Sequence, residues 1–276
     1  MNESVSPLLR DSFGRIISSL RISITDKCNF RCTYCMPESG ITLKPHSALL
    51  HYEQMSAIVA AAASLGISKV KITGGEPLVR KNIEELVRQI AAIPGITDLG
   101  MTTNASLLTY EKARILRQAG LMRLNISLDT IDPDAFRLIT RGGEIRDVLL
   151  GIDNAVTAGF SPVKINMVVM ETTTEADIDG IKQFCDERGL QLQKIAHFSL
   201  HRRMAHVETV TDRPPPCSRC NRLRLTADGF LKPCLFSDTE IKVNLNDIRG
   251  SLLAAVGNKP ENGDSCTSRS MSQIGG

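Results

Sequence analysis

The sequence has no tryptophan, and aromatic residues make up only 4% of its 276 residues. Proteins that bind single-stranded nucleic acid stack bases on aromatic side chains set among basic ones, so we expect no nucleic-acid partner. No apolar run reaches the length that a bilayer requires. The first 15 residues also lack the basic and apolar stretches of a secretion signal. These absences predict a cytoplasmic protein with no membrane partner.

Charge is nearly balanced over the whole chain but is unevenly distributed along it. The formal net charge is +3, yet the segment from Lys194 to Lys232 holds eight Lys or Arg against three acidic residues, a local excess of five. A local excess of one sign attracts ligands of the opposite sign. We therefore expect anionic ligands near this segment.

Short β-branched runs alternate with helical patterns over the first 198 residues, which is typical of a parallel α/β sheet. Six units, fewer than the eight of a closed barrel, predict a partial, open, TIM-like (β/α)6 barrel. Residues 1–198 would form this core, and residues 199–276 a C-terminal region in which a break at Pro214–Pro216 precedes the second cysteine group. The expected strands are Leu20–Thr25, Lys69–Thr73, Leu99–Thr103, Arg123–Leu128, Val163–Val169 and Leu190–Ala196.

Six of the eight cysteines fall into two groups, a pattern that in a reducing compartment indicates metal or cluster ligands. The first group, Cys28, Cys32 and Cys35, directly follows the first expected strand. Three thiolates can hold a 4Fe–4S cluster and leave one iron open. Zinc is the alternative, although structural zinc prefers a fourth protein ligand.

The second group consists of Cys217, Cys220 and Cys234, and its spacing alone fits zinc and iron–sulfur equally well. Cys185 falls on an apolar helical face and is expected to be buried without chemistry. Cys266 is either a structural cysteine or a fourth ligand to the second group, which would then have no open iron.

The motif Cys28-Asn-Phe-Arg-Cys-Thr-Tyr-Cys35 resembles that of the radical S-adenosylmethionine (SAM) superfamily. Thr73-Gly-Gly-Glu-Pro77 resembles the segment of that superfamily that contacts the methionine part of SAM. Two glycines allow close approach of the backbone to a ligand, and Glu76 can accept from an ammonium; a simple Gly-Gly turn is the alternative. The resemblance implies that an open iron binds SAM and that a 5′-deoxyadenosyl radical then removes a substrate hydrogen.

The segment Cys217–Phe236 resembles the second cluster of the GTP 3′,8-cyclase family, which acts in molybdenum cofactor biosynthesis. The resemblance implies a lyase with two 4Fe–4S clusters and SAM that converts GTP to 3′,8-cyclo-7,8-dihydroguanosine triphosphate. Arg222 and Arg224 match an Arg-x-Arg of the family, and alternate residues of a strand point the same way. Two guanidinium groups on one face suit a triphosphate, whereas a solvated charged edge is the alternative.

The same resemblance assigns further residues. It implies GTP contacts from Arg21, Lys71, Thr102, Lys164, Arg222 and Arg224, and SAM contacts from Tyr34, Gly75, Glu76 and Ser127. It also implies that the terminal Gly275 and Gly276 reach the active site and serve catalysis, although the composition of residues 258–276 alone predicts a flexible end.

Three departures from the family pattern keep alternatives open. About 40 family residues are missing before Cys217, Gln193 replaces an arginine, and Cys266 is additional. Losing that arginine would remove one charged hydrogen bond, about 1.5 to 3 kcal/mol, unless Lys194, His201, Arg202 or Arg203 replaces it. Phe198 replaces a methionine that contacts SAM. The alternatives are a radical SAM enzyme for a peptide or another nucleotide, and a non-catalytic metal-binding protein.

Partners follow from the same resemblance. It implies GTP, a one-electron reductant such as flavodoxin or ferredoxin, and a downstream cyclic pyranopterin monophosphate synthase that takes up the product. A homodimer is compatible with it.

Overall fold

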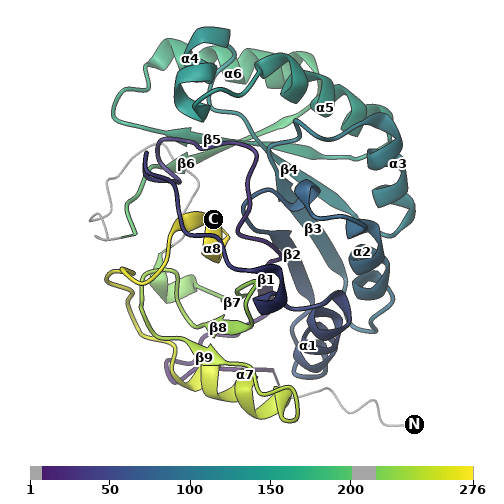
Figure 1. Ribbon diagram of the computed structural model, residues 1–276, viewed down its shortest axis with the longest axis vertical. Helices are drawn as coiled ribbons and strands as arrows, with labels where there is room; N and C mark the ends of the chain where they lie inside the picture. Colours follow the sequence, from purple (N-terminus) through teal and green to yellow (C-terminus); the bar gives the residue numbers. More distant parts are fainter. Residues whose placement is uncertain (1–7, 201–215, 276) are drawn as a thin grey trace.

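The computed structural model describes residues 8–200 and 216–275. Within them, nine strands form one sheet in the order β6-β5-β4-β3-β2-β1-β7-β8-β9 (Figure 1). The strands are β1 (Ser19–Ser23), β2 (Lys69–Thr73), β3 (Asp98–Thr103), β4 (Arg123–Ser127), β5 (Val163–Val169), β6 (Gln191–Ala196), β7 (Arg222–Leu225), β8 (Phe230–Lys232) and β9 (Ile241–Lys242).

Strands β1 to β6 are parallel and neighbour one another in chain order. They coincide with the six predicted strands, with ends shifted by no more than two residues. Because β6 and β9 are the two edges of the sheet, the barrel does not close. The prediction of a partial, open α/β barrel is therefore confirmed.

Six helices follow the first strands and lie on the outer face of the sheet (Figure 1). Thr109, Asp132 and Thr174 cap three of them by accepting from backbone N–H groups of the first turn. None of the helices in the described ranges has the length and apolar character to cross a membrane. The helices are α1 (Tyr52–Ser64), α2 (Ile83–Ala91), α3 (Tyr110–Gln118), α4 (Pro133–Thr140), α5 (Ile145–Thr157) and α6 (Glu175–Glu187), with 3-10 turns at His46–Ala48, Pro77–Val79 and Cys217–Arg219.

The alternation of side chains along β1 and β2 separates the core from the concave face. Leu20, Ile22 and Ile72 are fully buried in the apolar core beneath the helices. Arg21 and Lys71, which alternate with them, line a cavity on the concave face. The core thus holds the strands in a register that points the polar residues inward. Cys185 is buried in the core, as predicted.

The C-terminal region continues the same sheet. Strand β7 pairs in parallel with β1, so that Leu20 faces Leu223 and Arg21 faces Arg224. Strands β8 and β9 then add antiparallel pairs. The domain boundary at residue 198 stays a prediction, since hydrogen bonds between β1 and β7 join both parts.

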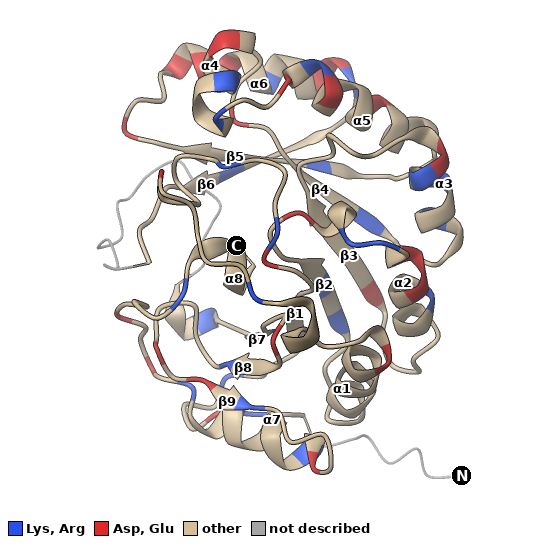
Figure 2. Ribbon diagram, in the orientation of Figure 1, with Lys and Arg blue, Asp and Glu red and all other residues tan. Residues whose placement is uncertain are grey.

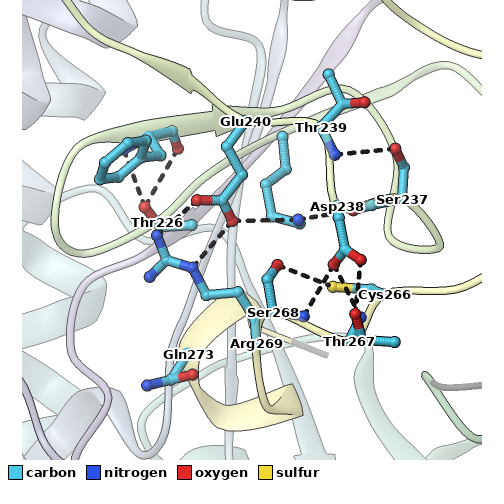
Figure 3. A network of polar contacts seen from close by, with 12 residues as sticks. Thr226, Ser237, Asp238, Thr239, Glu240, Cys266, Thr267, Ser268, Arg269 and Gln273 are labelled. Atoms are coloured by element: carbon cyan, nitrogen blue, oxygen red, sulfur yellow. Dashed lines mark hydrogen bonds and ion pairs between the residues drawn. The ribbon is translucent and has the colours of Figure 1, made fainter.

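The end of the chain folds back into the curve of the sheet. After α7 (Ile248–Gly257), an extended segment leads to the short helix α8 (Met271–Ile274), which lies inside the concave face in Figure 1. Polar contacts hold this segment against the β8–β9 connection (Figure 3). The Asp238 carboxylate accepts from the backbone N–H groups of Thr267 and Ser268 at 2.8 and 2.9 Å. Composition alone therefore predicted the wrong character for this segment.

Arg269 is the central cation of this anchor. Its guanidinium donates to Asp228 at 2.9 Å and to Glu240 at 2.8 Å. The side chains of Arg269 and Asp228 are each only 8% exposed, and that of Glu240 16%. A buried charge is tolerated only when it is paired, so this network fixes the path of the C-terminal segment.

We expect Arg269→Met to lower the free energy of unfolding of the cluster-free protein by about 3 kcal/mol, because two buried carboxylates lose a cation. Urea unfolding measures this change. Arg114→Met is the matched control, since Arg114 pairs with Glu111 on the exposed face of α3 and its loss should change stability little. Equal losses in both variants would contradict the anchoring role.

Candidate active site

A single cavity of about 960 Å³ on the concave face brings the two cysteine groups together. The members of both groups line it, from the loop after β1 on one side and from the loops before β7 and after β8 on the other. The carboxyl ends of the parallel strands open toward it, where α/β barrels place their chemistry. The predicted residues that line this cavity are Arg21, Cys28, Cys32, Tyr34, Cys35, Lys71, Gly75, Glu76, Thr102, Ser127, Lys164, Cys217, Cys220, Arg222, Arg224 and Cys234.

The loop that carries the first cysteine group is held by the end of α4. Backbone N–H groups of Arg31 and Thr33 donate to the carbonyls of Thr140 and Ile139 at 3.1 and 2.9 Å. The Arg141 guanidinium also donates to the carbonyl of Arg31 at 3.1 Å. The end of α4 and the Arg141 side chain therefore hold the backbone that carries the three thiols.

The surroundings of the first group suit a cluster larger than one ion. In the described parts of the chain, no three Cys, His, Asp or Glu side chains converge closely enough to hold a single metal ion. The thiols of Cys28, Cys32 and Cys35 are nevertheless close enough for their charges to interact. Three neighbouring thiols are the ligand set that a 4Fe–4S cluster with one open iron requires.

Burial raises the pKa of Cys28 to about 11 and that of Cys35 to about 12. Burial, followed by the charge of Cys35, also raises the pKa of Cys32 well above its ordinary value. Thiols that are protonated without a cation must release protons when they bind a metal. Binding of a cluster would therefore ionise these three thiols.

The Gly74-Gly75-Glu76 turn is packed against the chain segment that leads to the first group. A Cβ on Gly75 would lie 2.2 Å from the carbonyl oxygen of Lys27, and Glu76 N–H donates to that oxygen at 2.8 Å. The glycine is therefore required for a backbone-to-backbone contact, in addition to any approach by a ligand.

The carboxylate of Glu76 is already well supplied with donors. It accepts from the Thr103 hydroxyl at 2.7 Å and from the backbone N–H groups of Asn104 and Leu78 at 2.7 and 2.9 Å. Burial raises its pKa to about 7, against the effect of these hydrogen bonds. Glu76 thus ties the ends of β2 and β3 together, and its contact with SAM stays a prediction.

Tyr34 and Asp129 form a buried pair on the other side of the first group. The Tyr34 hydroxyl donates to Asp129 at 2.8 Å, and the Val168 N–H donates to the second carboxylate oxygen at 2.8 Å. Burial raises the pKa of Asp129 to about 6, although both hydrogen bonds lower it. Ser127, at the end of β4, and His197, whose ring centroid lies 6.5 Å from that of Tyr34, complete this wall.

The sheet register sets three basic residues side by side. Arg224, Arg21 and Lys71 occupy facing positions on β7, β1 and β2, and neighbouring strands are about 4.8 Å apart. Figure 2 shows Lys and Arg positions along the strands of the sheet. The facing residue on β3 is Gly100, over which Lys71 extends to donate to Asn125 at 2.6 Å. Adjacent like charges repel, and a bound anion relieves that repulsion.

The residues in and directly after β6 that differ from the family pattern lie in different places. Gln193 and Phe198 line the cavity, and Phe198 packs edge-on against Phe236 at 5.3 Å. Lys194 does not line it, so the proposed replacement of the lost arginine by Lys194 has no support. The other suggested replacements, His201, Arg202 and Arg203, lie outside the described residues.

The second cysteine group lies among cations. Burial alone would raise the pKa of Cys220, yet the positive charges of Lys259 and Arg222 lower it to about 7. Cys217 and Cys234 line the same cavity. Cys266 is fully buried beside Leu200 and does not line the cavity. Cys234 packs against the same small apolar cluster, so both roles of Cys266, structural cysteine and fourth ligand, stay predictions.

The C-terminal segment reaches this cavity at two points. The carbonyl of Gly275 accepts from the buried guanidinium of Arg224, and a Cβ on Gly275 would lie 2.3 Å from the Thr73 side chain. The Cys35 thiol lies beside the backbone of Ser272, which lowers its pKa against the larger effect of burial. Burial, and then the charge of Arg222, lower the pKa of Arg224 to about 9. Gly276 lies outside the described residues.

Three polar residues near the cavity were not anticipated. Asp129 lies two residues after the end of β4, and its position after a strand of the α/β barrel was the available signal. Lys259 and Arg15 are single charges with no local pattern, and only the three-dimensional contacts described below reveal them.

Comparison with known proteins gives both a family and a fold. The model of the Radical SAM superfamily matches residues 22–185. The GTP 3′,8-cyclase of Thermodesulfovibrio yellowstonii is 39% identical over 323 aligned positions, which cover 97% of this chain and 100% of that protein. The GTP 3′,8-cyclase of Listeria monocytogenes is 35% identical, and its alignment covers 98% of this chain and 99% of that protein. The 323 positions exceed the chain length by 47, so that alignment includes positions that this chain lacks.

Solved structures support the fold. Streptococcus suis SuiB bound to S-adenosylmethionine has a TM-score of 0.68 at 16% identity and covers 90% of this chain and 66% of its own. The protein anSMEcpe with bound AdoMet has a TM-score of 0.64 at 14% identity, covering 88% of this chain and 81% of its own.

The Asp129 pKa predicts a pH-dependent effect of Asp129→Asn in the cluster-free protein. The pKa rises from 3.8 to about 6 on folding, so ionised Asp129 destabilises the fold above pH 6, and this cost disappears below pH 4. Relative to the wild type, the Asn variant should gain about 2 to 3 kcal/mol between pH 4 and pH 7. The Tyr34 hydroxyl can accept from the new amide. Urea unfolding across this range measures the gain, and a pH-independent difference would contradict it.

Proposed function

Because the chain belongs to the radical SAM superfamily, and within it to the GTP 3′,8-cyclase family, we propose that it converts GTP to 3′,8-cyclo-7,8-dihydroguanosine triphosphate for molybdenum cofactor biosynthesis. The observation that carries this proposal is the single cavity that two cysteine groups and a row of basic residues share. The reaction joins C3′ of the ribose to C8 of guanine.

Cys28, Cys32 and Cys35 would hold a 4Fe–4S cluster with one iron open to SAM. Together, bound cluster and SAM supply the one-electron chemistry that removes a hydrogen atom from an unactivated C–H bond. The protein holds the reactants in place and keeps water away from them. Phe198, Phe236 and Ile195 supply apolar surface to the cavity wall for that purpose.

The SAM pocket in this proposal lies between the Gly75 turn and the Tyr34–Asp129 pair. Glu76 fixes the turn through its three donors, and Asp129 fixes the Tyr34 ring through its hydroxyl. Ser127 presents a hydroxyl from the end of β4. Residues held in this way orient a ligand without having to reorganise when it binds.

The triphosphate would lie across the row of Arg224, Arg21 and Lys71, with Arg222 and Lys164 beside it. Forked guanidinium groups match phosphate oxygens, and the sheet register sets the three basic residues of the row side by side. Thr102 offers a neutral hydrogen bond at the end of β3. The base then points toward the second cluster, held by Cys217, Cys220 and Cys234, whose open iron would bind the purine. Gly275 and Gly276 would complete the site from the tail.

We also propose that the protein acts in the cytoplasm and that a flavodoxin or ferredoxin supplies its electron. The product would pass to a cyclic pyranopterin monophosphate synthase. These assignments rest on the family alone.

A second candidate is a radical SAM enzyme of the same architecture for a peptide or another nucleotide. It is favoured by Gln193, which lines the cavity where the family has an arginine, and by the shorter chain. The two candidates predict the same fold and clusters and differ only in substrate.

We expect anaerobic reconstitution to give about eight irons per chain, since each cysteine group would hold four. With reductant, SAM and GTP, mass spectrometry should show 5′-deoxyadenosine and cyclised nucleotide in equal amounts. 5′-Deoxyadenosine with untouched GTP would favour the second candidate. About four irons, or tightly held zinc, would contradict the two-cluster proposal.

We expect Arg222→Ala to weaken GTP binding about ten- to hundredfold, because one charged hydrogen bond is lost. Isothermal titration under anaerobic conditions measures this affinity, and SAM binding should be unchanged. Arg249→Ala is the matched control, as it removes an exposed arginine of α7 that does not line the cavity. Equal GTP affinity in both variants would remove Arg222 from the phosphate site.

A further inference from the structure

Lys259 is a buried lysine at the second cysteine group with no assigned role. It is only 4% exposed and follows the end of α7. Its Nζ donates to the carbonyl of Arg222 at 2.9 Å and to the carbonyl of Pro233 at 2.6 Å. Arg222 stands two residues after Cys220, and Pro233 directly precedes Cys234. One ammonium group therefore joins the two chain segments that carry these cysteines.

The charge of Lys259 has no carboxylate partner in the described part of the chain. Lys232, which is also fully buried, shows the ordinary solution, because its Nζ lies 3.2 Å from the carboxylate of Glu240. Lys259 has only two neutral carbonyls as hydrogen-bond acceptors, and no ion pair. Burying an unpaired charge is costly. An anion placed beside this cation would therefore stabilise the site.

The nearest sites for such an anion are the thiols. The charge of Lys259 acts directly on Cys220, and both residues line the cavity. A 4Fe–4S cluster held by three thiolates carries net negative charge and provides the missing partner. Hydrogen bonds and nearby charge are among the features that set the potential of such clusters.

The segment that begins with Lys259 also holds the third cysteine. The carbonyls of Pro260 and Glu261 accept from the Arg15 guanidinium at 2.6 and 2.8 Å. The same guanidinium donates to the carbonyl of Cys217 at 2.9 Å. Residues 259–261 thus connect all three cysteine-bearing segments. Of residues 259–261, Lys259 alone is a cation, and its positive charge acts on the Cys220 thiol.

We propose that Lys259 is a positioning residue and the counter-charge of the second cluster: it holds the Cys220 and Cys234 segments together and stabilises the reduced cluster. The inference rests on the second cluster of the proposed function. A cation beside a cluster favours the form with the extra electron, so its removal lowers the reduction potential of that cluster alone.

Lys259→Met, which keeps most of the side-chain volume, tests the proposal, and Lys259→Arg restores the charge. Lys242→Met is the matched control, because Lys242 is exposed and donates to the carbonyl of Asp228, away from the cysteines. Each protein is reconstituted anaerobically. Iron per chain, electron paramagnetic resonance spectra of the reduced protein with and without SAM, and a redox titration are recorded.

We expect one of two results for Lys259→Met. Its iron content falls from about eight to about four per chain while the SAM-responsive signal of the first cluster is retained, or it keeps eight irons and the reduction potential of the second cluster alone is lower. Lys259→Arg and Lys242→Met should match the wild type in both respects. Eight irons with unchanged potentials in Lys259→Met would overturn the proposal. Loss of both clusters would overturn it too, since Lys259 would then support the fold as a whole. A wild type with only four irons would instead overturn the proposed second cluster.

Discussion

The parallel pairing of β7 with β1 is the contact on which the site depends. The alternation of parallel strands and helices ends with β6. The next strand, β7, pairs with β1, at the far side of the parallel sheet from β6. The register then places Leu223 against Leu20 in the core and Arg224 against Arg21 above the cavity. A shift of β7 by one residue would turn its own two arginines, Arg222 and Arg224, into the core. The buried leucines of β7 therefore set the positions of the arginines that alternate with them.

That pairing concentrates positive charge in a place with little acidic compensation. Among the described residues, no carboxylate pairs with the buried Arg224 or Lys259, whereas Arg269 and Lys232 share Glu240. The difference separates two kinds of cation in one region. Cations with carboxylate partners fix the C-terminal segment, and those without are suited to bound anions, the proposed cluster and triphosphate.

The sequence predicted the strands, the open barrel and the residues around the cavity because each depends on a local pattern. β-Branched runs mark β2 and β5, and motif positions at strand ends mark the cavity. It did not reveal the contact of Lys259 with Pro233, 26 positions away, or that of Arg15 with Cys217, 202 positions away. Glu76 shows the intermediate case. Its motif identified an important carboxylate, but three donors from the loops after β2 and β3 bind it, and no local pattern encodes them.

The C-terminal segment connects the Arg269 network to the residues that line the cavity. Its anchor, from Arg269 to Asp228 and Glu240, lies outside the cavity. The short helix α8 follows, and directly after it the Gly275 carbonyl accepts from Arg224. A guanidinium has five N–H donors, so Arg224 can hold the tail and still donate to an anion. The tail and a triphosphate would then share one cation. Because that cation is buried and fixed by the β1 register, binding either partner at Arg224 constrains where the other can lie.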